Sequence, residues 1–351
     1  MTLDRLANLT SQYELNSRAQ AFVRYTIARA VGFDASVDAA EVFEKRWPNS
    51  KYISMVQKAA VPAGTTGNWG APLVPVLGFA SEFLELVRPL TILGRMRGYR
   101  PVPFRVKFNK QTSGATAGWV GEMKPIPVGK LDMSTEEFEH SKVAGIIVLS
   151  KELVRSSDPA AEGLIMRDIV GGIAQFTDEQ LLDPTVTETA VRPASITNGL
   201  AAIPSTDPEA DLLALTAALK AAGAQFLAPY FIMSPGNALA LAALKNSQGA
   251  SVFPSVNVTG GDIWGIPVLV SANAGDQITL LDAAELMLAD GIVELDIAQE
   301  AALQMDDNPT DGAVQMVSLF QTNSVGFRGV RTIRWRMRNP GAVAYVSGAS
   351  Y

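Results

Sequence analysis

The residues from Ser113 to Met133 read SGATAGWVGEMKPIPVGKLDM, and the interpretation of the whole chain depends on them. The segment before them, Pro101–Phe108, alternates polar and apolar residues in the manner of a β-strand. The segment after them, Met133–Lys142, has a similar alternation. We therefore expect two sides of a long hairpin, with the quoted stretch at its tip. A connection of this length is uncommon inside a compact domain and usually has a function of its own or is disordered.

The glycines and lysines of this stretch also raise the alternative of a phosphate-binding loop. A Walker-type loop needs Gly-Lys followed by Ser or Thr, but Gly129 and Lys130 are followed by Leu131. Two nearby prolines, Pro125 and Pro127, lack the N–H groups with which such a loop holds phosphate. The glycine spacing of a dinucleotide-binding turn is absent as well. The sequence therefore predicts no nucleotide cofactor here and favours contact with another protein.

The sequence also gives no support for other catalytic or metal-binding sites. A zinc site is excluded because the chain has no cysteine and a single histidine, His140, which we interpret as an exposed strand residue. The acidic group Asp306, Asp307 and Asp311 lacks the spacing of a calcium loop, so a solvated turn is favoured over a Mg²⁺ or Ca²⁺ site. No G-x-S-x-G nucleophile motif occurs. We therefore predict no catalytic residue, no metal ligand and no cofactor, and expect that the chain is not an enzyme.

The composition is that of a folded, acidic protein. Hydrophobic residues make up 48% and charged residues 18% of the 351 residues, which argues against general disorder. No window approaches the roughly 20 consecutive apolar residues of a membrane-spanning helix. The net charge of −6 argues against tight, sequence-independent binding of nucleic acid, because such binding depends on Lys and Arg at the phosphates.

Along the chain, regular patterns alternate with stretches that break them. Residues 1–60 have helical spacing, and Val61–Phe79 is rich in Gly and Pro and predicts a linker or an extended arm. A long helix is expected over Asp158–Pro184, with Pro159 in its first turn and Pro184 at its end. Residues 206–314 alternate helix and strand patterns, with IWGIPVLVS as one strand, which indicates an inserted α/β domain.

Near the end of the chain, Arg334, Arg336 and Arg338 recur at every second residue and are expected to share one face of a strand. Such a face is able to bind phosphate or nucleic acid. We favour the alternative that it pairs with acidic residues of a neighbouring element or subunit.

The order of these parts resembles the major capsid proteins of tailed bacteriophages, which have the Hong Kong 97-type fold that encapsulin shells also use. The resemblance covers most of the chain from Val61 onward. Its carriers are GNWGAPLVP and FLELVRPLTILGRM for an N-terminal arm, PFRVKFN and AGWVGEMKPIP for the extended hairpin, IIVLSKELVRSSDPAAEGLIMRDIVGGIAQFTDEQLL for the strand and long helix, YFIMSPGNALALAALKNSQG and IWGIPVLVS for the axial domain, and GFRGVRTIRWRMRNPGAVAYV for the closing strands.

The resemblance implies an α+β fold with named parts. These are a helical N-terminal segment (1–60), an N-terminal arm (61–95), an extended hairpin or E-loop (96–135), a peripheral domain (136–205 and 315–351) with a spine helix (158–183), and an inserted axial domain (206–314). Contacts between subunits are then expected at Trp69, Trp119, Glu122, Lys124, Lys130, Arg334, Arg336 and Arg338. Trp119 is the expected packing anchor of the hairpin.

The implied function is that of a structural protein that self-assembles, through pentamers and hexamers, into the icosahedral virion shell around a double-stranded DNA genome. Its implied partners are copies of itself, a portal protein, a maturation protease or scaffold during prohead assembly, and the packaged DNA through weak contacts, with no membrane. Assembly is expected in the cytoplasm of the bacterial host. The N-terminal segment is either removed or retained.

Two other functions remain open: an encapsulin-like compartment that holds an enzyme cargo, and a soluble α/β enzyme with dispersed site residues. In some relatives, a hairpin lysine forms an isopeptide bond with an asparagine of a neighbouring subunit, promoted by a glutamate. Lys124 corresponds to that lysine, but Gln315 aligns near the asparagine, and Gln321 or Thr322 near the glutamate. We therefore predict no autocatalytic cross-linking.

Overall fold

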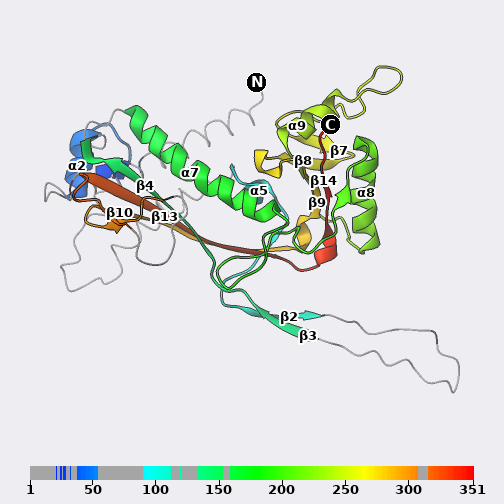
Figure 1. Cartoon of the computed structure of the whole chain (residues 1–351), viewed down its shortest axis with the longest axis horizontal. Helices are drawn as coiled ribbons and strands as arrows, with labels where there is room; N and C mark the ends of the chain where they lie inside the picture. The colour runs from blue at the N-terminus through cyan, green and yellow to red at the C-terminus, as the bar shows by residue number, and fades with distance from the viewer. Residues whose placement is uncertain are drawn as a thin grey trace. The chain divides into compact units, whose positions relative to one another are not determined.

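The computed structural model describes residues 21, 24–25, 27–28, 32, 38–53, 90–111, 119, 133–152, 159–306 and 315–351 (Figure 1). These residues belong to two compact units. Unit 1 comprises Met1–Arg95, Val143–Glu179 and Gly291–Thr332, and unit 2 comprises Met96–Lys142, Gln180–Asp290 and Ile333–Tyr351. Among the described residues, no helix has the length and apolar character needed to cross a membrane.

Unit 2 contains a six-stranded sheet with the strand order β5-β14-β9-β6-β8-β7. Its strands are β5 (Ile203–Pro204), β6 (Pro229–Met233), β7 (Gly261–Ile263), β8 (Ile266–Val270), β9 (Ile278–Asp282) and β14 (Val343–Ser347). Strand β14 pairs antiparallel with β9 and parallel with β5. Residues 343–347, which the resemblance places in the peripheral domain, thus pair with strands of residues 203–282.

Two helices of this unit begin where the sequence places a cap and a proline. Helix α8 (Pro208–Ala221) begins after Asp207, whose carboxylate accepts a hydrogen bond from the Ala210 N–H. Helix α9 (Pro235–Ala243) begins after Ser234, which accepts from the Asn237 N–H. Such caps satisfy backbone donors that the first helical turn leaves open. The leucines of α8 pack with the sheet into the main core, formed by buried residues that include Leu212, Leu215, Leu219, Phe231, Met233 and Leu280.

The stretch IWGIPVLVS, which we expected to be one strand, is a tight hairpin. Strands β7 and β8 pair through Ile263 and Ile266. The two residues between them, Trp264 and Gly265, have φ angles of 53° and 80°. A two-residue loop with positive φ at both positions matches the twist of the flanking strands and reverses the chain. The prediction of a continuous strand was wrong because a tryptophan here adopts a backbone conformation that side chains usually avoid.

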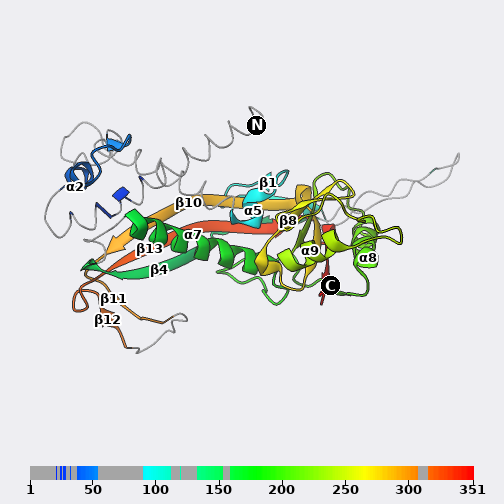
Figure 2. The ribbon, with the colours of Figure 1, turned by 90° about the horizontal axis from the view of Figure 1, so that it is seen from above.

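A second sheet has the order β1-β10-β13-β4, and its strands are seen from above in Figure 2. They are β1 (Arg100–Pro101), β4 (Lys142–Ser150), β10 (Leu286–Ala298) and β13 (Ser324–Met337). The long helix α7 (Pro159–Leu182) confirms the helix expected over Asp158–Pro184. The division between the two units falls inside β4, α7, β10 and β13.

The predicted hairpin is present as β2 (Lys107–Gln111) paired antiparallel with β3 (Met133–Glu137). The strand expected over Pro101–Phe108 is interrupted, since residues 102–106 belong neither to β1 nor to β2. Pro103 has no N–H to donate, and Arg105 has a φ of 62°, so the strand is irregular there, although the Arg105 N–H still donates to the Phe138 carbonyl. Apart from Trp119, the hairpin tip lies outside the described residues.

The remaining described elements are short. They are α2 (Ala39–Arg46), α5 (Ile92–Arg95), β11 (Ala302–Leu303), β12 (Val317–Ser318) and the 3₁₀ turns η2 (Ala272–Ala274), η3 (Ala283–Glu285) and η4 (Pro340–Ala342). Helix α2 lies within residues 1–60, whose spacing predicts helix, and Asp38 caps it by accepting from the Ala40 N–H. The Gly/Pro-rich stretch Val61–Phe79, with Trp69, lies outside the described residues.

Candidate functional site

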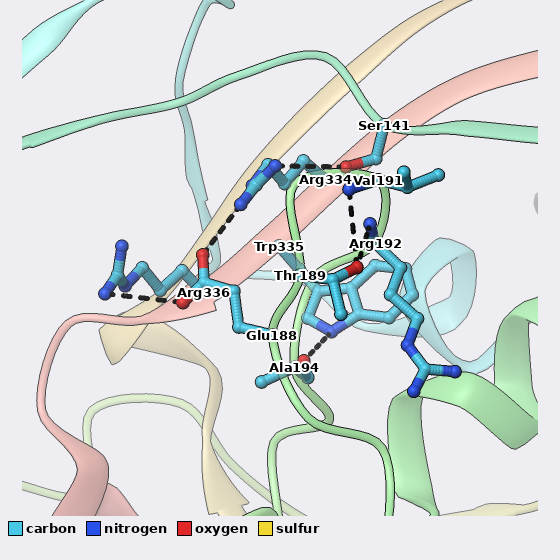
Figure 3. A network of polar contacts seen from close by, with 9 residues as sticks. All are labelled: Ser141, Glu188, Thr189, Val191, Arg192, Ala194, Arg334, Trp335 and Arg336. Carbon is cyan, nitrogen blue, oxygen red and sulfur yellow. Dashed lines mark hydrogen bonds and ion pairs between the residues drawn. The ribbon is translucent and has the colours of Figure 1, made fainter.

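The arginine-rich end of β13 is organised around one carboxylate, that of Glu188 (Figure 3). Arg334 Nη2 donates to Glu188 Oε1 at 2.7 Å, and Arg336 Nη2 lies 3.7 Å from Glu188 Oε2. Arg334 Nη1 also donates to Ser141 Oγ at 3.2 Å. Arg334 and Arg336 are thus brought together, as expected for residues on one face of a strand.

Trp335, between the two arginines, attaches the strand to the same loop from its other face. Its indole Nε1 donates to the Ala194 carbonyl at 2.9 Å, and the side chain is buried. The loop itself is closed by Thr189, whose Oγ1 accepts from the backbone N–H groups of Val191 and Arg192. Residues 188–194 therefore contact both faces of β13, and this fixes where the arginine side chains lie (Figure 3).

Arg338 does not join this group. It follows the last residue of β13 and lies with Nη1 3.7 Å from Glu285 Oε1, while its backbone N–H donates to the Glu285 carbonyl at 2.8 Å. Burial also separates the three arginines: the side chain of Arg334 is 8% exposed, that of Arg336 35% and that of Arg338 51%. Arg334 is held inside its own chain, and the guanidinium groups of Arg336 and Arg338 are accessible from outside.

Two arginines, Arg334 and Arg336, lie against the single carboxylate of Glu188. Guanidinium groups bind carboxylates and phosphates in a two-pronged geometry. The partly exposed guanidinium groups of Arg336 and Arg338 are therefore suited to an acidic side chain of another molecule.

Of the other predicted contact residues, Trp119 is fully exposed. Trp69, Glu122, Lys124 and Lys130 lie outside the described residues. His140 is exposed and stacks at a tilt on Phe104, with 4.7 Å between the ring centroids. Within the part of the chain that the structure describes, no group of three or more His, Cys, Asp or Glu side chains is arranged to hold a metal ion.

The sequence patterns did not single out one buried carboxylate, that of Asp282. Asp282 is buried and accepts hydrogen bonds from the N–H groups of Leu227, Ala228 and Ala284, at 3.0, 3.0 and 3.1 Å. Its hydrogen bonds to Leu227 and Ala228 hold the residues just before β6 against the end of β9. Its position at a strand end, before the short apolar residues Ala283 and Ala284, was the available signal.

The fold is found in solved structures of phage particles. The chain aligns with a structure from Mycobacterium phage Cain with a TM-score of 0.56 and 16% identity, covering 74% of this chain and 89% of that chain. It aligns with one from Gordonia phage Cozz with a TM-score of 0.55 and 16% identity, covering 75% and 85%. The architecture is the α+β, Hong Kong 97-type capsid fold.

Comparison of the sequence with known proteins also identifies the family of the chain. Residues 82–348 match the model of the phage capsid family, and the chain belongs to this family. A curated relative, the capsid polyprotein of Pseudomonas phage PAJU2, is 38% identical over 359 residues, which covers 94% of this chain and 54% of the relative. The chain thus spans about half the length of that relative. Family membership makes it a component of a virion capsid.

Proposed function

We propose that this chain is the structural major capsid protein of a tailed phage and assembles with copies of itself into the icosahedral shell around the double-stranded DNA genome. The observation that carries the proposal is the family match over residues 82–348, supported by the 38% identity to a phage capsid polyprotein. A protein of this kind needs no catalytic group, and we propose that it is not an enzyme.

The parts of the fold then acquire roles in assembly. The hairpin of β2 and β3, within residues 96–135, is the E-loop that reaches a neighbouring subunit, and α7 is the spine helix of the peripheral domain. The six-stranded sheet belongs to the axial domain, near the centre of each pentamer or hexamer. Residues 61–95 are the N-terminal arm, and residues 1–60 are a helical segment that assists assembly.

The partly exposed guanidinium groups of Arg336 and Arg338 contact acidic residues of a neighbouring subunit in this proposal. Trp69, Glu122, Lys124 and Lys130 are further contacts, on the arm and the hairpin. Assembly takes place in the cytoplasm of the bacterial host, with a portal protein and a protease or scaffold. The packaged DNA is touched only weakly, because the acidic balance of the chain disfavours many simultaneous phosphate contacts.

The test is to express the full chain, with any co-produced scaffold, and to analyse the product by size-exclusion chromatography and negative-stain electron microscopy. The proposal expects polyhedral particles that elute at the void volume. A monomer or dimer under every assembly condition would contradict it and favour a soluble enzyme. Closed particles that hold a co-purifying enzyme and never DNA would favour the encapsulin-like alternative.

A further inference from the structure

An open apolar groove runs along β4 in unit 1. It has a volume of about 360 Å³ and is bounded by one strand and one helix. The lining residues are Val143, Ala144, Gly145, Ile146 and Ile147 of β4 and Gly172, Ile173 and Phe176 of α7. Successive side chains of a strand point to opposite faces, so five consecutive lining residues mean that the groove follows the edge of the strand.

Among the described residues, no strand covers this edge, because β4 is the last strand in the order β1-β10-β13-β4. No lining residue carries a charge, and Ile146 and Phe176 are 51% and 47% exposed. Proteins usually protect an apolar sheet edge with charges, prolines or a covering segment, because it otherwise invites pairing. An exposed apolar groove of this kind marks a site where another molecule binds.

A matching side chain is present elsewhere in the same chain. Trp119, in the hairpin between β2 and β3, is fully exposed. The residues around it, Ser113–Gly121, carry no charge, as is also true of the groove. A tryptophan buries a large apolar area at little entropic cost and is enriched among the residues that dominate interface affinity. In a single subunit the Trp119 side chain is exposed to water, so its apolar area is not buried.

We propose that Trp119 of one copy inserts into the groove between β4 and α7 of a second copy. The inference rests on the proposed function, since it requires that the chain assembles with itself. The inserted side chain and the groove are different surfaces, so the contact is heterologous, and each subunit gives one tryptophan and receives one. Contacts of this type generate rings when the rotation closes. The second copy is the occupant that the observations favour, because both halves of the contact are apolar, uncharged and present in every subunit.

The glycines of α7 give a matched pair of positions with which to test the contact. Gly171 and Gly172 are neighbours, and a Cβ added at either meets no atom within 4 Å, but only Gly172 lines the groove. The chain has no cysteine of its own, so introduced thiols are unique. One full-length chain carries Val120→Cys, beside the intact Trp119, and a second carries Gly172→Cys. The two are co-assembled and treated with a short bismaleimide that joins two thiols.

The expected result is a covalent dimer that links residue 120 of one chain to residue 172 of the other, identified by mass spectrometry. With Gly171→Cys in place of Gly172→Cys, the yield should fall by about tenfold. Adding Trp119→Ala to the Val120→Cys chain should lower it comparably, as expected when a dominant interface side chain is removed.

A second variant tests the groove without cross-linking. Gly172→Leu places a side chain in the groove and should prevent assembly, whereas Gly171→Leu should assemble as the unchanged chain does. Equal cross-linking at 171 and 172, or cross-links formed only within one chain when both cysteines are on it, would overturn the inference. Particles that form normally from Gly172→Leu would also overturn it and leave the proposed function intact. A failure of the unchanged chain to form particles would overturn both.

Discussion

Glu188 is the residue on which two arginines of β13 depend. It accepts from Arg334, whose side chain is 8% exposed, and lies near Arg336. Removing one member of a largely buried pair leaves the other charge without compensation, and this costs more than the pair contributes as a whole. The carboxylate of Glu188 is itself 41% exposed, so water moderates the loss.

We therefore expect Glu188→Ala to lower the free energy of unfolding by about 1.5 kcal/mol, the lower end for a hydrogen bond to a charged group. Urea unfolding of the dissociated subunit measures it. The matched control is Asp296→Ala, which removes the partner of Arg328 from an ion pair in which both side chains are more than half exposed. That change should cost at most about 1 kcal/mol. Equal losses in the two variants would contradict the special role of Glu188.

Asp211 carries a second residue-scale prediction, which concerns pH. Burial raises the pKa of Asp211, but hydrogen bonds from Ser205, Tyr351 and Thr206 outweigh that effect and hold the pKa below its ordinary value. Ser205 Oγ lies 2.6 Å and the Thr206 N–H 2.9 Å from the carboxylate, and Tyr351 Oη donates to it. A carboxylate whose pKa is lowered by folding stabilises the fold above its unfolded pKa, and this contribution disappears as the pH falls through the folded pKa.

Tyr351→Phe removes one of these donors and should raise the pKa of Asp211. Stability near pH 7 should fall by about 1 kcal/mol, for the loss of one partly exposed hydrogen bond. Because less stabilisation remains to be lost, stability should also depend less steeply on pH below about pH 5. Urea unfolding at a series of pH values measures both effects. Parallel curves for the two proteins, with the same slope at acid pH, would show that Tyr351 does not influence Asp211.

At the scale of elements, the same substitution should have opposite effects in a helix and at the start of a strand. A Cβ at Gly171 in α7 meets no atom within 4 Å, whereas a Cβ at Gly261 in β7 would lie 2.0 Å from the Ser255 carbonyl oxygen, at a φ of +129°. Gly171→Ala should stabilise by about 0.5–1 kcal/mol through helix propensity. Gly261→Ala should destabilise by about 1–3 kcal/mol through backbone strain alone.

Chemical denaturation of both variants beside the unchanged protein decides this prediction. Gly265→Ala is a useful control for Gly261→Ala, since Gly265 has a positive φ of +80° but open space around its Cβ position. Gly265→Ala should be destabilised by its backbone conformation alone, without a steric clash. It should therefore lose less stability than Gly261→Ala. A destabilising Gly171→Ala would mean that α7 requires a bend at this glycine.

The elements that local patterns define were predictable from the sequence. Helix α7 begins and ends within two residues of the expected bounds, because prolines stand at both ends. Helices α8 and α9 follow from a capping residue and a proline. The pairing of β14 with β5 and β9 was not predictable, since no local pattern encodes which distant strand a segment joins. The pairing of Arg334 with Glu188 was not predictable for the same reason, because the two residues lie 146 positions apart in the sequence.

At the scale of the whole molecule, the hairpin lysine provides a prediction about the assembled particle. Lys124 has no asparagine and glutamate at the positions that align with the cross-linking partners of some relatives. Particles boiled in denaturant should therefore migrate on a gel as single chains. A ladder of covalent oligomers would contradict this prediction, and mass spectrometry of the ladder would show which residue replaces the asparagine.

Four continuous elements, β4, α7, β10 and β13, pass from unit 1 to unit 2. Each unit is thus assembled from three separate stretches of the chain, so no single continuous fragment contains a whole unit. Contacts between residues far apart in the sequence require the closure of long loops, which slows folding.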